Sequence, residues 1–273
     1  MTRVEGPVWI VGASTGMGRS VALKLARAGV PVAISARSAD KLQAVADEAG
    51  PKAARIVPVP LDATDEAAVA AALDQVEQAL GPVATLIYGA GFWKLAPADT
   101  LTVKLFRDHF EVNFFAALTV ALAAFGRMRT RGRGRIMLIS SVAGYTGLPG
   151  AAAYGASKAA MTHVAESLHP EAGRDGVLVQ VASPGFVDTP MTASNPFPMP
   201  FIISADKAAD RIIAGLKTRR FEISFPRRFT LLLKLLRCLP YPLYFALMRP
   251  PARADDAAQP TGAGASTSDS ARR

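Results

Sequence analysis

The sequence predicts an α/β fold built on a doubly wound parallel sheet, because short apolar runs alternate with longer segments of helical pattern. The runs are apolar throughout and show no alternation of polar and apolar residues, which is typical of strands that helices cover on both faces. We expect strands at residues 8–11, 32–35, 55–58, 85–88, 135–140 and 177–182.

The segments between these runs are rich in alanine and carry apolar residues at three- and four-residue spacing, which predicts amphipathic helices. We expect helices over residues 19–28, 41–49, 66–80, 105–127 and 156–171. Strands that alternate with helices in this way indicate a Rossmann-type sheet in a single domain over residues 1–225.

The pattern changes after residue 225. Residues 226–251 are hydrophobic and basic, and their internal charges and prolines argue against a continuous membrane span. We expect a basic amphipathic extension that lies on a membrane surface, with an oligomer contact or a flap over the site as alternatives. Residues 252–273 hold no large apolar side chain, so we expect a disordered tail.

The net charge of +9 is unevenly distributed. Residues 1–216 carry a balance of +2, whereas residues 217–253 carry +8, so the basic excess belongs to the extension and nucleic-acid binding is not expected. Cys238 is the only cysteine, and no secretory pattern precedes the first strand. We expect a cytoplasmic protein, peripheral on the cytoplasmic membrane face.

A glycine cluster links the first predicted strand to the first predicted helix. Glycines at this place allow a tight turn, and they let backbone N–H groups approach a pyrophosphate at the helix N-terminus. A dinucleotide is therefore the expected ligand, and a glycine-rich turn without a ligand is the alternative. The expected contacts are Gly12, Ser14, Thr15, Gly16, Met17 and Gly18.

The ends of the next two strands indicate which dinucleotide binds. Arg37 follows the second strand, where a site for NAD usually has an acidic residue, and an arginine suits a 2′-phosphate. The prediction is therefore NADP(H) rather than NAD(H), unless Arg37 is only a solvated surface charge. Asp62 ends the third strand and is expected to contact adenine, or else to cap the next helix.

Further motifs lie at strand ends or on helices in a fixed order: Tyr88-Gly89-Ala90-Gly91, Asn113, Ser140-Ser141, Tyr154-x3-Lys158 and Pro184-Gly185. Together with the glycine cluster they resemble the classical short-chain dehydrogenases/reductases over roughly residues 7–220. The resemblance implies an NADP-dependent oxidoreductase that passes hydride between the nicotinamide and a carbonyl or alcohol.

The chemistry of these residues agrees with that resemblance. Tyr154 and Lys158 are four apart on a predicted helix, so both lie on one face. A tyrosine with its usual pKa near 10 is a poor base, and we expect the Lys158 ammonium to lower that pKa and make Tyr154 a usable acid or base. Ser141, at the end of the fifth strand, is expected to hydrogen-bond the substrate oxygen.

The resemblance also implies roles for residues beyond this pair. Asn113 would anchor a water in a proton relay to Lys158, with an ordinary helix-interior asparagine as the alternative reading. Gly89 departs from the family pattern, which has asparagine there, so an amide that braces neighbouring strands is lost. The remaining cofactor contacts implied are Ala90, Gly91, Tyr154, Lys158, Pro184, Gly185, Val187 and Thr189.

Substrate and partners are less closely indicated. Residues 192–204 follow the sixth strand and contain Phe197, Met199 and Phe201, which predicts an apolar pocket for a lipophilic carbonyl or alcohol, unless they only pack on the core. The resemblance implies a homodimer or homotetramer. No metal is expected, because the three histidines are scattered. A non-catalytic NADP(H)-binding regulator at a membrane surface is the alternative function.

Overall fold

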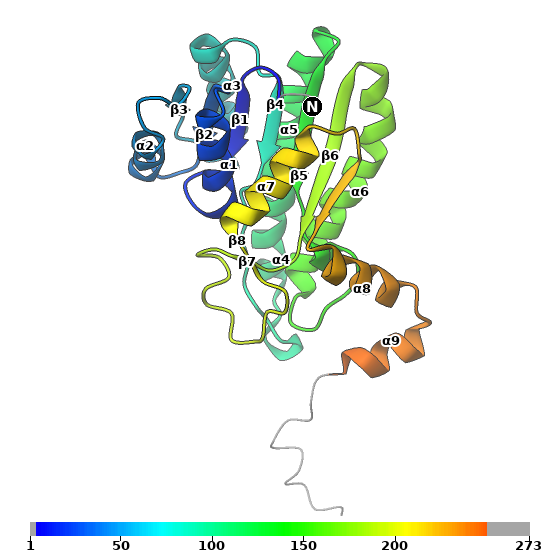
Figure 1. The fold of residues 1–273 in the computed structure, drawn as a ribbon. Helices are drawn as coiled ribbons and strands as arrows, with labels where there is room; N and C mark the ends of the chain where they lie inside the picture. Colours follow the sequence, from blue (N-terminus) through cyan, green and yellow to red (C-terminus); the bar gives the residue numbers. More distant parts are fainter. Residues whose placement is uncertain (1–3, 250–273) are drawn as a thin grey trace, which may run out of the picture. The chain divides into compact units, whose positions relative to one another are not determined.

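The computed structural model of the chain describes residues 4–249. Its main sheet has seven parallel strands in the order β3-β2-β1-β4-β5-β6-β9, which confirms the predicted doubly wound, Rossmann-type α/β fold (Figure 1). The strands are β1 (Val8–Val11), β2 (Val32–Ser35), β3 (Ile56–Pro58), β4 (Thr85–Tyr88), β5 (Gly134–Ile139), β6 (Val177–Pro184) and β9 (Glu222–Phe225).

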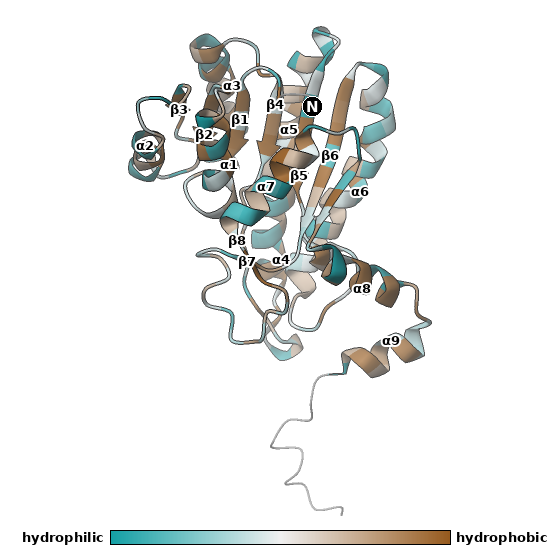
Figure 2. Cartoon of the chain, viewed as in Figure 1, coloured by the Kyte–Doolittle hydropathy of each residue, from teal (hydrophilic) through white to brown (hydrophobic). Residues whose placement is uncertain are grey.

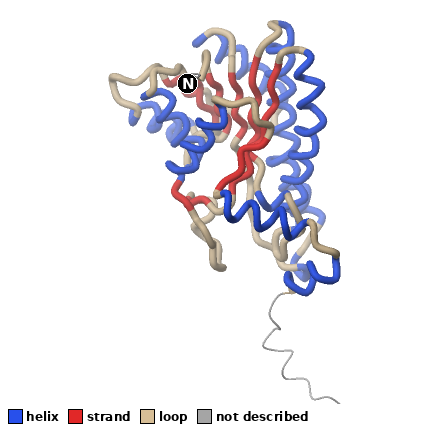
Figure 3. Tube along the Cα trace, turned by 45° about the vertical axis from the view of Figure 1, so that its right-hand side comes forward, coloured by secondary structure: helices blue, strands red, loops and turns tan. Residues whose placement is uncertain are grey.

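Helices cover both faces of this sheet, as the tube in Figure 3 shows. The helices of the main body are α1 (Gly16–Arg27), α2 (Ala39–Glu48), α3 (Glu66–Leu80), α4 (Val103–Phe110), α5 (Ala116–Thr130), α6 (Ala152–Arg174) and α7 (Ala205–Leu216). A small pair of strands, β7 (Val187–Asp188) and β8 (Ile203–Ser204), lies between β6 and α7.

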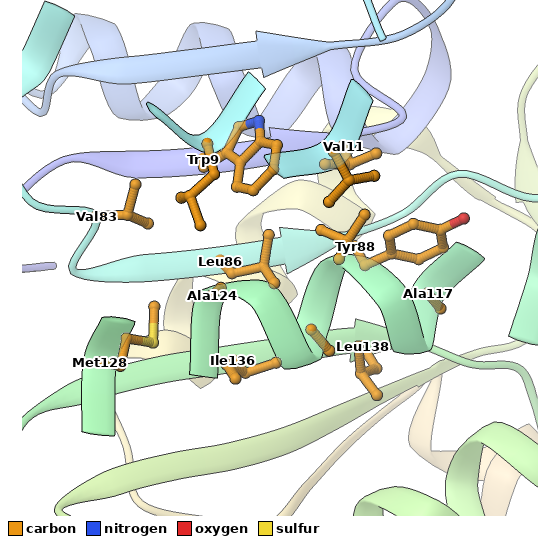
Figure 4. Packing of buried hydrophobic residues seen from close by; sticks show 14 of the residues in the cluster. Trp9, Val11, Val83, Leu86, Tyr88, Ala117, Ala124, Met128, Ile136 and Leu138 are labelled. Atoms are coloured by element: carbon orange, nitrogen blue, oxygen red, sulfur yellow. The ribbon is translucent and has the colours of Figure 1, made fainter. Parts of the chain in front are cut away.

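The alternation of side chains along each strand divides the core into two layers. Trp9 and Val11 of β1 pack with α3, α5 and α6, where Figure 4 shows them beside Leu86 of β4. Ile10, on the opposite face of β1, packs with α1 and α7. Figure 2 accordingly shows the central strands as hydrophobic along their length, because each strand is buried on both sides.

The seventh strand, β9, was not predicted. Its four residues include Glu222 and Ser224 and are mostly half-buried, so they form no continuous apolar run. The strand exists because it pairs with the edge of β6, where Ala182 lies opposite Ile223. Pairing of this kind is decided by a distant part of the chain, and local pattern does not report it.

Within residues 4–249, one helix has the length and hydropathy of a membrane span, over Val103–Thr130. It comprises α4, a π-helical turn at Glu111–Phe115 and α5. Its buried side chains, among them Val120 and Met128, pack against the sheet in the core shown in Figure 4. Core helices of globular domains have the same composition, so the helix is explained by its place in the fold.

The C-terminal extension forms two helices that belong to different compact units. Helix α8 (Arg227–Arg237) is part of the unit that ends at Leu239 and carries the sheet. Helix α9 (Tyr241–Met248) belongs to a second unit that begins at Pro240. The predicted disordered tail at residues 252–273 lies outside the described residues.

Candidate active site and cofactor site

The glycine cluster forms the turn between β1 and α1 for steric reasons. Gly12 has a φ of +89°, and a Cβ there would lie 2.2 Å from the backbone nitrogen of Ala90. A Cβ on Gly18 would lie 2.3 Å from the carbonyl oxygen of Gly12. Neither position accommodates a side chain, so the turn brings the start of α1 against the loop after β4.

The start of α1 has the properties of an anion site. The N-cap residue, Thr15, makes no side-chain capping hydrogen bond, and the first turn contains no acidic residue. The first amide groups therefore have no capping side chain, at the end of the helix where the dipole favours negative charge. These features fit the pyrophosphate of a dinucleotide.

A cavity of about 440 Å³ lies beside this turn. Ser14, Thr15 and Gly16 line it from one side, and Asp188 and Thr189 line it from the segment after β6. Two predicted groups of cofactor residues, far apart in the sequence, therefore meet at one place. Thr189 also approaches the glycine turn directly, because a Cβ on Gly16 would lie 3.0 Å from its Cγ2 atom.

Basic residues near this cavity were only partly foreseen. Arg37 is exposed at the carboxyl end of β2, close enough to Asp62 to help lower the pKa of that carboxyl group. Arg19 and Lys41 line the cavity, and Arg37 does not. Arg19 pairs with Glu48, so part of its charge is already matched. The positions of Arg19 and Lys41 in the sequence did not indicate that these two residues line the cavity.

Asp62 does not cap the following helix, so that alternative is wrong. The cap of α3 is Asp65, whose side chain accepts from the Ala68 amide at 3.0 Å. Asp62 instead accepts from the Thr64 amide at 3.1 Å and from the Thr64 hydroxyl at 2.8 Å, both through Oδ1. These hydrogen bonds lower the pKa of the Asp62 carboxyl and hold the turn after β3. Its predicted adenine contact stays a prediction.

Ser141, Tyr154 and Lys158 meet at the carboxyl edge of the sheet. Ser141 follows β5, and the other two lie in the first turns of α6. Lys158 is buried, and its Nζ donates to the Ile139 carbonyl at 2.8 Å and lies 5.8 Å from the ring centre of Tyr154. The Ser141 hydroxyl accepts from the Ala143 amide at 3.1 Å and lies close enough to the Tyr154 hydroxyl to lower the pKa of that group. The three predicted residues therefore form one site.

The protonation of this site differs from the expectation. Burial raises the pKa of Tyr154, and the nearby Ser141 hydroxyl opposes that rise only in part. Burial lowers the pKa of Lys158 to about 7. The expected lowering of the Tyr154 pKa by the Lys158 ammonium is wrong, because removal from water disfavours both charged forms. Tyr154 therefore keeps its proton at neutral pH, as a proton donor must.

Asn113 lies in the π-helical turn and is completely buried. Its Nδ2 donates to the Phe92 carbonyl at 2.9 Å and to the Ser157 hydroxyl at 3.0 Å, and its Oδ1 accepts from the Phe92 amide at 2.7 Å. The side chain thus ties the loop after β4 to α6. This is more than an ordinary helix-interior asparagine does, and it supplies bracing beside the position where Gly89 lacks an amide.

The remaining predicted contacts lie around the same site, although Gly185 is a glycine for a reason unrelated to the cofactor. A Cβ on Gly91 would lie 3.5 Å from Oδ1 of Asn113 and 4.0 Å from Nζ of Lys158, so this loop passes next to the lysine. Gly185 has a different reason for being glycine. A Cβ there would lie 2.7 Å from the Phe229 ring of α8, so its small size admits that helix. Met17, Pro184 and Val187 lie beside these segments.

Aromatic residues close the site opposite the cofactor turn. Trp93 packs edge-on against Tyr154, with ring centres 4.9 Å apart, and its Nε1 donates to Oδ1 of Asn195 at 2.8 Å. The loop after β7 is thereby joined to the loop after β4. Sequence reasoning missed Asn195, because a lone asparagine in a proline-rich loop carries no pattern. The ring centre of Phe197 lies 5.9 Å from that of Phe186, and the ring centre of Phe201 lies 6.0 Å from that of Phe229, although Phe201 is 52% exposed. An apolar substrate pocket lined by these two residues stays a prediction.

His109 is a packing residue. It is buried, and its ring lies 4.6 Å from that of Phe92. Its Nδ1 lies 2.8 Å from the Leu105 carbonyl, and its Nε2 accepts from the Lys94 amide at 3.3 Å. These contacts support the loop that carries Trp93.

Comparison with known proteins agrees with this geometry. The family described as short chain dehydrogenase matches residues 7–197. A Myxococcus xanthus protein named uncharacterized oxidoreductase is 35% identical over 240 residues, which cover 88% of this chain and 95% of that protein. The 3-oxoacyl-[acyl-carrier-protein] reductase of Escherichia coli is 33% identical over 69% of this chain and 76% of its own length.

Solved structures show the same relationship. A short-chain dehydrogenase from Burkholderia cenocepacia, solved in complex with NADP, superposes with a TM-score of 0.79 at 26% identity and covers 92% of this chain and all of its own. With the glycine turn, the Ser141–Tyr154–Lys158 site and the seven-stranded sheet in place, the chain belongs to the short-chain dehydrogenase family and is an oxidoreductase with a nicotinamide dinucleotide as its cofactor.

Proposed function

We propose that this oxidoreductase reduces a lipophilic ketone or aldehyde with NADPH, and that Tyr154 is the proton donor. The convergence of Ser141, Tyr154 and Lys158 at the carboxyl edge of the sheet carries the proposal. The reduced nicotinamide, when bound, supplies the hydride that adds to the carbonyl carbon. The Tyr154 hydroxyl transfers its proton to the carbonyl oxygen, so an alcohol and the oxidised cofactor result.

The residues around Tyr154 would position the substrate and the cofactor and return the proton. Ser141 lies near the Tyr154 hydroxyl and would hold the carbonyl oxygen beside it. Lys158 would hold the ribose of the cofactor, exchanging its present hydrogen bond to the Ile139 carbonyl for one to a ribose hydroxyl. Asn113 keeps the π-helical turn against α6, and a water on its backbone carbonyl would return a proton toward Lys158.

The preference for NADP rests on Arg37. It is exposed where the adenosine ribose is expected, at the carboxyl end of β2, and no carboxylate precedes Asp40 on that segment. Lys41 adds a second positive charge beside the cavity. The similar Burkholderia cenocepacia enzyme, crystallised with NADP, supports the same preference.

The substrate class rests on the residues that face Tyr154. Trp93 lies against the tyrosine ring, and the Met191 side chain reaches within contact distance of the Gly91 position. Apolar groups of this size favour an apolar substrate, with the hydroxyls of Ser141 and Tyr154 to orient its oxygen. The Escherichia coli relative, by its name, reduces a 3-oxo group on an acyl chain, which is chemistry of the same type.

We also propose a homo-oligomer that pairs through α5 and α6. Phe115, at the end of the π-helical turn before α5, and Leu122 of α5 expose large apolar side chains. Such residues on a rigid helix are typical of an interface between identical subunits.

Titration with NADPH and NADH tests the cofactor proposal. We expect tighter binding of NADPH, and we expect the Arg37→Asp variant to lose that preference by at least tenfold because its carboxylate repels the 2′-phosphate. Lys52→Asp, a charge reversal at an exposed turn, serves as the control. Unchanged preference in Arg37→Asp would contradict the assignment. Binding without turnover of any carbonyl substrate would favour the regulator alternative.

A further inference from the structure

Helix α8 is fixed on the main body by its inner face. Phe229 and Leu233 are buried in a cluster with Val142 and Tyr145, which belong to the segment directly after Ser141. Lys234 pairs with Glu222 of β9, and Glu222 in turn accepts a hydrogen bond from the Tyr145 hydroxyl. The buried cluster and the ion pair together define which side of α8 faces inward. The residues on the opposite side of the helix therefore face outward.

The outer side of α8 is apolar and cationic. Leu231, Leu232 and Leu235 are 60%, 49% and 66% exposed, and their spacing of three and four residues places them on one face. Arg227, Arg228 and Arg237 are exposed at the two ends of the same helix. Three exposed leucines in one stripe leave apolar area in water, which marks a contact surface rather than scattered exposure.

The inner side of α8 reaches toward the substrate site. Phe229 of α8 lies 6.0 Å, ring centre to ring centre, from Phe201, which is itself 52% exposed. Ile202 and Met191, in the same loop, are also exposed. Because α8 directly follows β9, the stripe and this loop both lie at the carboxyl edge of the sheet, where Tyr154 is found (Figure 1). Figure 2 shows the hydrophobic residues along α8.

Charge identifies the partner. Glu222 is the only acidic residue between positions 217 and 253, and it is already paired with Lys234. Two copies of this chain that met through α8 around a twofold axis would place the arginines of one helix against those of the other, and like charges oppose such a contact. An anionic surface with an apolar interior satisfies both the arginines and the leucines.

Helix α9, taken by itself, requires the same kind of surroundings. Tyr241, Leu243, Phe245 and Leu247 are all strongly exposed and lie on two opposite sides of a helix that holds no charged residue. A helix that is apolar all round is stable only inside protein or lipid. Arg249 follows its end, where a cation can reach head groups.

We infer that the outer face of α8, with the adjoining loop at Phe201 and Ile202, docks on an anionic lipid bilayer and turns the mouth of the substrate site toward it. Lipophilic carbonyl compounds dissolved in the bilayer then reach Tyr154 without crossing water. The second statement rests on the proposed reductase function. The docking itself does not, so the two are tested separately.

Vesicle flotation of the full-length protein tests the docking. Phosphatidylcholine vesicles rich in phosphatidylglycerol are compared with vesicles of phosphatidylcholine alone, at low and at high salt. We expect binding to the anionic vesicles that weakens with salt. Replacing Leu231, Leu232 and Leu235 by Gln should lower the partition coefficient by roughly 100-fold or more, because all three apolar side chains are lost from the lipid.

Two arginine pairs offer a matched comparison. Arg227→Gln with Arg228→Gln removes two charges at the carboxyl end of β9 and should weaken binding by roughly 20-fold. Arg219→Gln with Arg220→Gln removes two exposed charges at the opposite end of that strand and should change binding little. Equal effects of the two pairs would show that only net charge matters, which would overturn the assigned surface.

Further outcomes separate the hypotheses. Binding of the Tyr154→Phe variant should equal that of the wild type, so a failed reductase assay leaves the docking result intact. Circular dichroism checks that the leucine variant is folded. If that variant changes the sedimentation coefficient instead of the vesicle binding, the stripe is a subunit contact and the inference is wrong. No binding of the wild type to anionic vesicles would also overturn it.

Discussion

Replacement of Lys158 by Met should make the folded protein more stable at neutral pH. Lys158 is 4% exposed, and burial lowers the pKa of its amine from the ordinary 10.5 to about 7. Since one pKa unit corresponds to about 1.4 kcal/mol, the charged amine costs the folded state up to about 5 kcal/mol. Methionine has a similar length and no charge, but it leaves the Ile139 carbonyl without its donor, which costs about 1–3 kcal/mol. We expect a net gain of roughly 2–4 kcal/mol near pH 7.

The pH dependence is the sharper part of this prediction. Between pH 7 and 10.5 the unfolded lysine binds a proton that the folded one has released, so the wild type gains stability as the pH rises. The variant lacks this contribution, so its advantage should shrink by about 1.4 kcal/mol per pH unit and reach zero between about pH 8.5 and about pH 10.

Urea unfolding at pH 7, 8 and 9 measures this difference, at one protein concentration because the family forms oligomers. Lys52→Met, at an exposed turn, is the control, and it should run parallel to the wild type. A Lys158→Met curve that also runs parallel to the wild type would refute the reasoning, because the lysine would then pay no penalty for burial. Activity should be lost in either case.

Two further predictions concern activity. At saturating NADPH, kcat for carbonyl reduction should hold from pH 6 to 9 and fall only above pH 10, because burial raises the pKa of Tyr154 and reduction needs its proton. Alcohol oxidation should rise as the pH approaches 10, because it needs the deprotonated Tyr154. A Tyr154→Phe variant that reduces the carbonyl at the wild-type rate would point to another donor. Asn113→Leu should lower kcat by roughly 100-fold and the free energy of unfolding by about 2–4 kcal/mol, because the variant leaves the Phe92 amide and carbonyl unpaired in the core. Steady-state kinetics and melting curves measure these two effects. A wild-type kcat in the variant would contradict the bracing role of Asn113.

The alternation of apolar runs and helical segments was sufficient to predict the sheet. All six expected strands exist, with ends that shift by at most two residues. Parallel strands buried on both faces leave a continuous apolar signature, and that signature is local. The edge strand at Glu222–Phe225 has one buried residue in four, so its pairing with β6 carried no comparable signal.

The candidate site was predictable where chemistry required a residue type at a fixed place. Gly12 and Gly18 have no room for a Cβ. Tyr154 and Lys158 are one helical turn apart, so their spacing placed them on one face, and the other motifs in register with them indicated a shared site. The link from Trp93 to Asn195 was not predictable, because it joins two loops separated by 102 residues through a single hydrogen bond.

The sequence alone determined the alternation of strands and helices from β1 to β6, the glycine turn, the candidate residues Ser141, Tyr154 and Lys158, and the concentration of positive charge near the C-terminus, because each depends on residue type and local spacing. Only the tertiary structure decided the protonation of Tyr154 and Lys158, the choice of Asp65 over Asp62 as a helix cap, and the side of α8 that faces outward. These depend on how much water each group loses and on which distant segments pack against it, and neither quantity is local to the chain.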